Sequence, residues 1–329
     1  MQQAITEQQS LKQIWYSKVF VLLEICKLAK NRELSFLPSD DSPNRVRCVN
    51  ASFVDILKKN FEGFHFMQRN FNLYYSLAHL KNMPMFSFNP STRKEQQAEF
   101  TRNFNKYFVG YDLGIDLDGN KDDNKDLIYY KGEKIKINRT HYGRKDNGNR
   151  GIESYDLIVD DKIVNAKPTE VEEMPIEEQV QRARNDLIKL IKEFDMYKIE
   201  VSYKFSGKRG FHANIDDRNF PDVEPTKKVE ISLKIENELA KILNLKTINY
   251  GLSDNRRIWK MSYSLVGDNV ALPLSDFQIK NFKLEDMKVV NILENIKIMN
   301  RGLLERNPNL SLEDKKANFM KLLKDYEVL

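Results

Sequence analysis

The feature that most constrains the fold is an alternating run of residues at 109–118, VGYDLGIDLD. Successive side chains on a β-strand point to opposite faces, so the apolar residues from Val109 to Leu117 share one face while Asp116 and Asp118 share the other. The two carboxylates would then lie roughly 6.6 Å apart along the strand. This arrangement suits a hard divalent cation such as Mg²⁺, although a solvated turn is the commoner meaning of the motif when it stands alone.

The composition indicates a globular chain with a substantial core. Its 329 residues are 41% hydrophobic and include 19 Phe, which is enough for one large or two ordinary domains. No apolar run approaches the length of a membrane span, and the first ten residues do not resemble a signal peptide. We therefore expect an intracellular protein without a membrane partner, located in the cytoplasm or nucleoid, or in the nucleus of a eukaryote.

The charge and cysteine content narrow the function classes only slightly. A net charge of +5 permits a polyanionic partner without requiring one. Cys26 and Cys48 are the only cysteines, which excludes a disulfide framework and a cysteine zinc module. Four histidines also leave little material for a transition-metal cluster.

Hydrophobic periodicity predicts the main elements. Helical spacing occurs at 11–30, and a second apolar stretch at 53–57 suggests another N-terminal helix. From 119 to about 167 the chain is polar, with alternating pieces at 127–130 and 135–137 that predict an inserted β-hairpin region. Residues 177–194 form an amphipathic helical pattern, strands follow at 199–205 and 211–215, and a capping box at Ser311 and Asp314 opens a C-terminal helix.

A glycine-rich turn separates the two later strands, with the sequence SGKRGFH at 206–212. Its glycines let the backbone approach a ligand, while Ser206, Lys208, Arg209 and His212 offer donors to phosphate oxygens. An ordinary hairpin with solvated surface charges is the alternative for this turn considered alone. The spacing does not match that of a P-loop.

A third polar segment follows, in which Asp254 precedes an alternating strand and Arg257 and Lys260 lie within a few residues. Such an aspartate could ligate a metal or act as a base, and a surface ion-pair cluster is again the alternative.

In this order the three segments resemble the small catalytic subunit of the archaeal and eukaryotic DNA primases. That family carries an acidic D-h-D pair on a strand, an S-G-x-x-G-x-H turn, and then an Asp followed by R-h-h-R-h-P-x-S-L, which aligns here from Asp254 to Leu265. The pieces RELSF at 32–36, VR at 46–47 and YSLA at 75–78 are similar to further family segments. The resemblance spans about residues 30–275.

The resemblance implies a function for each matched residue. It implies that Asp116, Asp118 and Asp254 are catalytic and hold two Mg²⁺ or Mn²⁺ ions. The residues it implies for nucleotide binding are Ser206, Lys208, Arg209, His212, Arg257, Lys260 and Arg47. It further implies single-stranded DNA as template, ribo- or deoxyribonucleoside triphosphates as substrates, and a large primase subunit as partner.

The chain also departs from the family pattern. Archaeal members usually carry a cysteine and histidine zinc module near the polar insert, and residues 119–170 contain no cysteine, so we expect no structural zinc. Ser262, Val266 and Asp268 stand where the family has proline, histidine and commonly lysine. These departures put initiation of new primers in more doubt than extension.

We accordingly predict an α+β fold in which a mixed or antiparallel sheet is flanked by helices. A catalytic domain would comprise 1–118 and 171–283, with a polar β-hairpin insert at 119–170 and a helical region at 284–329. The predicted function is that of a DNA primase catalytic subunit, synthesising short RNA primers, with DNA primers left open. The alternatives are a repair-type primase-polymerase that extends existing ends, and a non-catalytic nucleic-acid-binding subunit.

Overall fold

The computed structural model describes residues 15, 24, 27–28, 30–37, 46–47, 72–84, 86–87, 89–144, 150–250, 254, 256–294 and 309–329. Of the helix predicted at 11–30, only Trp15, Glu24, Lys27 and Leu28 are described as helical. The apolar stretch at 53–57 lies outside the described residues.

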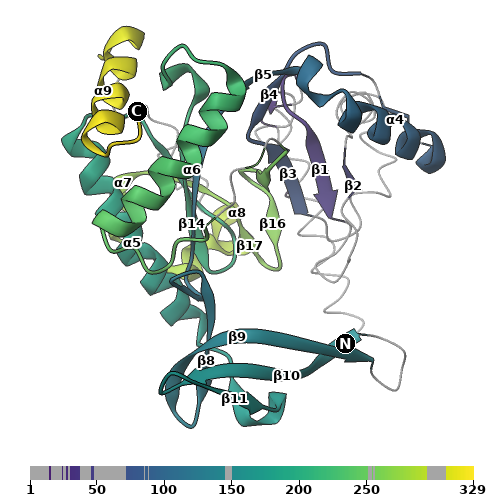
Figure 1. Ribbon diagram of the computed structural model, residues 1–329, viewed down its shortest axis with the longest axis vertical. Helices are drawn as coiled ribbons and strands as arrows, with labels where there is room; N and C mark the ends of the chain where they lie inside the picture. Colours follow the sequence, from purple (N-terminus) through teal and green to yellow (C-terminus); the bar gives the residue numbers. More distant parts are fainter. Residues whose placement is uncertain are drawn as a thin grey trace.

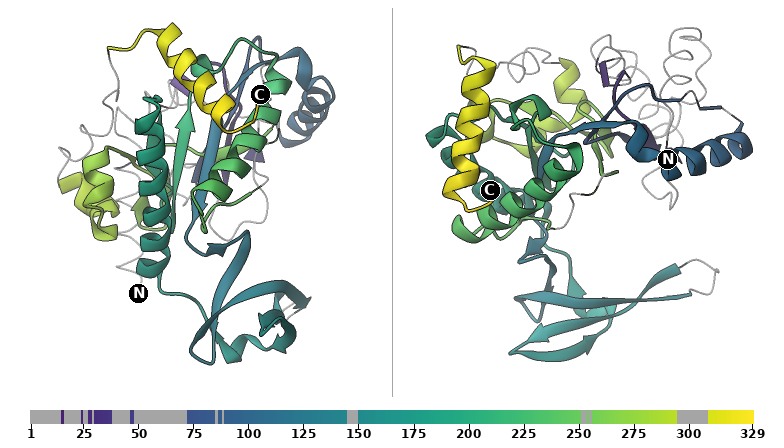
Figure 2. Two further views of the ribbon diagram at one scale, coloured as in Figure 1. Left: turned by 60° about the vertical axis from the view of Figure 1, so that its left-hand side comes forward. Right: turned by 45° about the horizontal axis from the view of Figure 1, so that its top comes forward.

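A four-stranded antiparallel sheet lies at the centre of the molecule. Its order is β18 (Pro273–Leu274), β13 (Ser202–Phe205), β14 (Gly210–Ile215) and β6 (Leu113–Asp118). The long helix α5 (Ile176–Met196) packs against β14 and β6, and α6 (Pro225–Ile242) packs against β5 (Phe108–Tyr111) and β6. Figures 1 and 2 show both helices running alongside these strands. The amphipathic helix predicted at 177–194 is thus present as α5, and the strands predicted at 199–205 and 211–215 are present as β13 and β14.

The predicted single strand at 109–118 is divided in two. β5 pairs with β4 (Ala78–Leu80), whereas β6 belongs to the central sheet, and Asp112 lies between them. We predicted that Val109 shares one face with Leu113, Ile115 and Leu117. Val109 lies instead on the separate β4–β5 pair and is 41% exposed, whereas the other three are buried.

A second antiparallel sheet has the order β15 (Ile258–Lys260), β3 (Asn72–Ser76), β1 (Leu34–Leu37) and β2 (Val46–Arg47). It meets the central sheet where Trp259 of β15 covers Gly114 of β6. A Cβ on Gly114 would lie 2.4 Å from the indole ring, so only glycine permits this contact. Helix α4 (Pro90–Arg102) flanks this part of the molecule and contributes Phe100 to a cluster of aromatic rings with Phe86 and Phe104.

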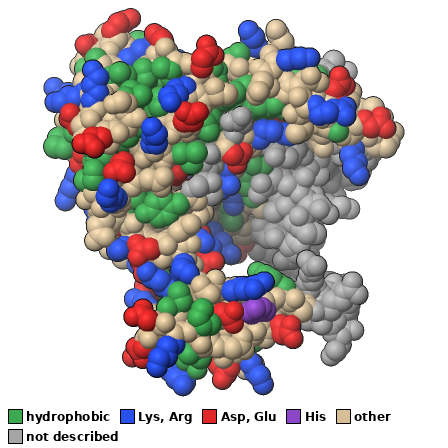
Figure 3. All heavy atoms as spheres, viewed as in Figure 1, with side chains coloured by type: hydrophobic (Ala, Val, Ile, Leu, Met, Phe, Trp, Pro, Cys, Tyr) green, Lys and Arg blue, Asp and Glu red, His purple; other side chains and the backbone are tan. Residues whose placement is uncertain are grey.

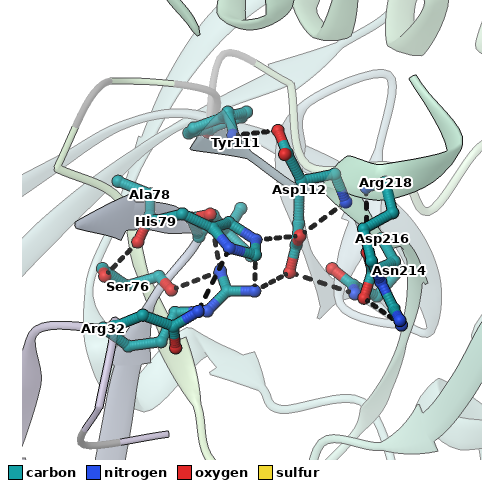
Figure 4. A network of polar contacts seen from close by, with 12 residues as sticks. Arg32, Ser76, Ala78, His79, Tyr111, Asp112, Asn214, Asp216 and Arg218 are labelled. Atoms are coloured by element: carbon teal, nitrogen blue, oxygen red, sulfur yellow. Dashed lines mark hydrogen bonds and ion pairs between the residues drawn. The ribbon is translucent and has the colours of Figure 1, made fainter. Parts of the chain in front are cut away.

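Asp112 connects the two sheets through a buried polar network (Figure 4). Its carboxylate accepts a hydrogen bond from Arg32 at 2.7 Å and lies 2.7 Å from the Nε2 of His79. It also accepts the backbone N–H of Asp217 at 2.9 Å. Burial acts to raise the pKa of Asp112, but the Arg32 charge and the His79 hydrogen bond outweigh it and hold that pKa well below its usual range.

The polar segment after β6 forms a sheet of its own, which projects from the rest of the molecule in Figure 1. Its strands are β7 (Lys121–Asp122), β8 (Lys125–Tyr130), β9 (Glu133–Arg144), β10 (Arg150–Val159), β11 (Lys162–Ala166) and β12 (Val171–Glu172). A small separate core of Ile128, Leu157 and Ala166 supports it. Acidic and basic side chains are interspersed on the face that Figure 3 shows, in keeping with the small net charge.

The C-terminal part is helical, with α7 (Asp276–Lys280), α8 (Val289–Glu294) and α9 (Leu312–Asp325). The predicted capping box is present, since the Ser311 hydroxyl accepts the N–H of Asp314 at 3.1 Å and Asp314 reaches back to Ser311. The predicted α+β class with antiparallel sheets flanked by helices is confirmed. Among the described residues, no helix combines the length and the apolar character needed to cross a bilayer.

Candidate functional site

The two acidic residues of β6 lie on one face of the central sheet. In the antiparallel register, Asp116 is opposite His212 and Asp118 is opposite Gly210, so the acid pair lies directly beside the end of the glycine turn. Both side chains are partly accessible, at 19% each. The chain thus places two partly accessible carboxylates on one face of the sheet rather than in its apolar core.

The glycine turn folds back over this pair. Gly207 has a φ of +94°, which favours glycine, and a Cβ on Gly210 would lie 2.0 Å from the carbonyl oxygen of Leu117. This close approach lets Arg209 form an ion pair with Asp118 through two contacts, Nε to Oδ1 at 2.6 Å and Nη2 to Oδ2 at 2.9 Å. The cation of the turn and one acid of β6 therefore already form a bidentate pair.

His212 lies between the acid pair and the second sheet. Its Nε2 is 3.4 Å from Oδ1 of Asp116, and its ring packs on Trp259 with the centroids 4.4 Å apart. Burial, followed by the nearby charges of Lys204, Lys260 and Arg257, lowers the pKa of His212 well below its usual value. The imidazole is therefore neutral at neutral pH, and it carries a single N–H.

The carboxyl of Asp116 has a raised pKa. Burial and then the charge of Asp118 raise its pKa to about 6, while a hydrogen bond from Asn249 at 3.3 Å and the charges of Arg257 and Arg209 act in the opposite direction. Burial disfavours the charged form of the carboxyl, and the like charge of Asp118 adds to that effect. Asn249 was not singled out from the sequence, because an asparagine in a loop carries no local signal of such a contact.

All the predicted site residues except Arg47 and Asp254 line one cavity of about 330 Å³. The acid pair and the glycine turn provide one side, and β15 provides the other. The cavity is lined by Tyr74, Asp116, Leu117, Asp118, Ser206, Lys208, Arg209, Gly210, His212, Arg257, Ile258, Trp259 and Lys260. Three segments far apart in the sequence are thus brought together around a space large enough for phosphate groups.

The structure does not bring Asp254 to the acid pair. Asp254 is exposed, does not line the cavity, and accepts the backbone N–H of Arg256 at 2.7 Å. Within the part of the chain that the structure describes, no three acidic, histidine or cysteine side chains are grouped to hold a metal ion. Arg47 pairs through its backbone with Ser35, and its side chain lies outside the described part.

Glu236 of α6 is a buried acid near the site that sequence reasoning missed. It is 1% exposed, and neither carboxylate oxygen has a hydrogen-bond partner among the described residues. Burial and then the charge of Asp116 raise its pKa to about 8, with Arg257 acting in the opposite direction. Its only sequence signal is its spacing: Glu236 is four residues from both Ser232 and Ala240, so the three side chains share the buried face of α6.

The acid pair fits a divalent cation. Mg²⁺ is usually held by one or two carboxylates together with substrate phosphates, and Asp116 and Asp118 provide that number on one face. A bound cation would also relieve the repulsion that raises the pKa of Asp116. The third carboxylate that the primase resemblance implies is not part of the arrangement.

Comparisons with known proteins add little. No family model matches the chain, and no curated protein matches it. Among solved structures, the polymerase domain of Mycobacterium tuberculosis ligase D, in complex with DNA, is similar with a TM-score of 0.44 and 8% identity, covering 87% of this chain and 89% of that one. A likeness this weak supports no inference about activity, so we base the function on the site itself.

Proposed function

We propose that the chain is a metal-dependent nucleotidyltransferase that joins nucleotides on a single-stranded DNA template. The observation that supports this most directly is the cavity in which Asp116 and Asp118 of β6 face the basic glycine turn. Two acids opposite several cationic and hydroxyl donors provide what displacement at phosphorus needs, because negative charge develops there on the attacking and leaving oxygens.

Asp116 and Asp118 would hold Mg²⁺ or Mn²⁺, which when bound supplies charge stabilisation at the reacting phosphate. Arg209 now occupies both oxygens of Asp118. Its guanidinium can exchange this carboxylate for a phosphate, because the planar carboxylate and the tetrahedral phosphate each accept two parallel N–H hydrogen bonds. Nucleotide binding would therefore free Asp118 for the cation at the same time as it engages Arg209.

The remaining residues would orient the triphosphate. Ser206 and Lys208 lie on the turn, and Arg257 and Lys260 approach from the side of β15. Neutral His212 can donate one hydrogen bond to a phosphate oxygen but adds no positive charge. The cationic side chains would thus neutralise the phosphates, and His212 would orient one phosphate oxygen.

The finer assignment is a DNA primase catalytic subunit that synthesises short primers and works with a large subunit. The ordered sequence blocks at 32–36, 116–118, 206–212 and 254–265 support it. Extension of existing ends is the alternative within the same chemistry. No structural zinc enters this proposal.

A primer-synthesis assay tests the function. Single-stranded DNA would be incubated with ribo- or deoxyribonucleotides and Mg²⁺ or Mn²⁺, with and without a preformed primer, and the products sized. We expect products from the wild type, none from Asp116→Asn, and wild-type yield from Asp160→Asn, which changes an exposed acid in the β10–β11 turn.

The pattern of products distinguishes primer synthesis, primer extension and a non-catalytic role. Products without a primer support primer synthesis, whereas products only with a primer indicate the extending enzyme. Absence of products together with absence of metal-dependent nucleotide binding would leave a non-catalytic nucleic-acid-binding subunit.

A further inference from the structure

His212 has few polar contacts that could fix the orientation of its ring. Its Nε2 is 3.4 Å from Oδ1 of Asp116, and within the described part of the chain its buried Nδ1 has no hydrogen-bond partner. In metal-binding and catalytic histidines, a hydrogen bond to the second ring nitrogen commonly fixes both the tautomer and the orientation of the imidazole. A contact of another kind must therefore hold the ring of His212.

The cavities beside His212 leave space into which its ring could turn. His212 lines the candidate site, of about 330 Å³, and also a larger cavity of about 820 Å³. A turn of the imidazole would move Nε2 away from Asp116 and from any phosphate bound beside it. An imidazole that orients a phosphate oxygen needs its own orientation fixed by the surrounding side chains.

The indole of Trp259 lies against the imidazole. The two ring centroids are 4.4 Å apart and the ring planes are inclined by 42°. Trp259 is 3% exposed, and β15 places it opposite Tyr75 of β3 in the second sheet. The ammonium of Lys204 lies 5.7 Å from the indole centroid. The second sheet thus holds a large aromatic surface beside His212.

The position of Trp259 is also fixed by Gly114 of β6. A Cβ on Gly114 would lie 2.4 Å from Cζ2 and 2.5 Å from Cη2 of the indole, so the ring occupies the space that any other side chain would need. Gly114 is two residues before Asp116 and therefore on the same face of the strand. The strand that carries the acid pair thus also sets where the indole lies.

We propose that Trp259 is a positioning residue that acts through His212 and holds Nε2 toward the phosphate-binding cavity. The indole face replaces the hydrogen bond that Nδ1 lacks. The single N–H lies on Nε2, because Asp116 or a phosphate oxygen can accept it there, whereas no described group accepts a proton from Nδ1. The phosphate contact of His212 rests on the proposed function, whereas the placement of its ring by Trp259 does not.

Nucleotide affinity in the presence of Mn²⁺ tests the proposal through a double-mutant cycle. We expect Trp259→Leu to weaken binding about 3- to 10-fold, the range of one aromatic pair, and Trp259→Phe, which keeps a ring, to weaken it less. In a His212→Ala background, Trp259→Leu should change the affinity by less than about twofold, because its partner is gone. Trp15→Leu removes the other tryptophan of the chain, which is also buried, and is the matched control with wild-type affinity.

The tautomer of His212 in the free protein provides a test that needs no nucleotide. Long-range ¹H–¹⁵N spectra at pH 7 show which nitrogen of each of the four histidines carries the proton, and His212→Gln assigns the signals. We expect Nε2–H alone in the wild type and an average of both tautomers in Trp259→Leu. In the wild type, the carbon-bound protons of His212 should also show the ring-current shift of an indole 4.4 Å away.

The outcomes separate this inference from the proposed function. Additive losses in the cycle would overturn the inference, because Trp259 would then act on the nucleotide directly. An unchanged tautomer in Trp259→Leu, or a proton on Nδ1 in the wild type, would overturn it as well. If the wild type binds no nucleotide with Mn²⁺ while the tautomer depends on Trp259, the ring placement is supported and the proposed function fails. Should Trp259→Leu not fold, Trp259→Phe and the wild-type ring-current shift provide the same comparison.

Discussion

Arg209 holds both carboxylate oxygens of Asp118, with Nε 2.6 Å from Oδ1 and Nη2 2.9 Å from Oδ2. A cation and a triphosphate would each need one partner of this pair. The pair therefore balances the charge of the cavity in the absence of ligands, and ligand binding exchanges it for two new ion pairs. Among the described residues, Asp116 has no comparable bidentate partner and accepts a side-chain hydrogen bond from Asn249. Burial and the charge of Asp118 therefore raise its pKa to about 6.

Arg209→Ala should weaken nucleotide binding in the presence of Mn²⁺ by about 10- to 100-fold, the equivalent of one charge-assisted interaction. Affinity for Mn²⁺ alone should not fall, because Asp118 loses a competitor for its oxygens. Isothermal titration with Mn²⁺, nucleotide and single-stranded DNA measures the three affinities, with Arg218→Ala as an exposed arginine control. A larger effect on DNA than on nucleotide would place template, not triphosphate, at the turn.

Cation binding should depend on pH through Asp116. Its pKa of about 6 means that a proton competes with the cation below that pH, so apparent Mn²⁺ affinity should fall as the pH drops through 6, by up to about tenfold for each unit. Asp118→Asn removes the like charge and should move the midpoint to lower pH, although the affinity itself also falls. Titrations from pH 5 to 8 test this, and a flat profile for the wild type would disprove it.

The local chemistry of the site was predictable, because it depends on neighbours in sequence. Strand alternation placed Asp116 and Asp118 on one face, and two glycines indicated a close turn that carries Arg209. The break at Asp112 was not predictable, since the run continues to alternate through it. Only the pairing of β5 with β4 and of β6 with β14, set by distant segments, divides the run.

The electrostatic surroundings of the site could not be predicted in the same way. Lys204 and Glu236 are charged residues in ordinary strand and helix patterns, where a solvated position is the usual expectation. Lys204 is buried beside Tyr75 and Trp259 of the second sheet, and Glu236 lies on α6, which packs against β5 and β6. These neighbours come from other parts of the chain. The convergence of Asp254 with the acid pair came from family resemblance alone, and the described structure does not show it.

Asp254→Ala should therefore leave the affinity for Mn²⁺ in the absence of nucleotide within about threefold of the wild type, whereas Asp116→Asn should abolish it. Asp254 is exposed, and its visible interaction is with the backbone of Arg256 in the turn before β15. Titration of both variants with Mn²⁺ compares them directly. Equal losses would show that the 254–257 turn moves to complete the site when the cation binds.

Asp112→Asn should destabilise the fold by about 3–5 kcal/mol, because it removes the buried carboxylate that pairs with the Arg32 guanidinium at 2.7 Å. The exposed pair of Asp216 and Arg218 is a matched contrast, and Asp216→Asn should cost less than about 1 kcal/mol. Urea unfolding at neutral pH measures both differences.

The pH dependence of that difference tests its origin in charge. The pKa of Asp112 is depressed in the folded state, so its stabilisation is fully present above the unfolded pKa of about 3.9 and is lost as the pH falls toward the folded value. The gap in unfolding free energy between the wild type and Asp112→Asn should accordingly narrow as the pH falls from about 4 to about 2. A gap that stays constant over this range would mean that packing, rather than the ion pair with Arg32, is what the substitution removes.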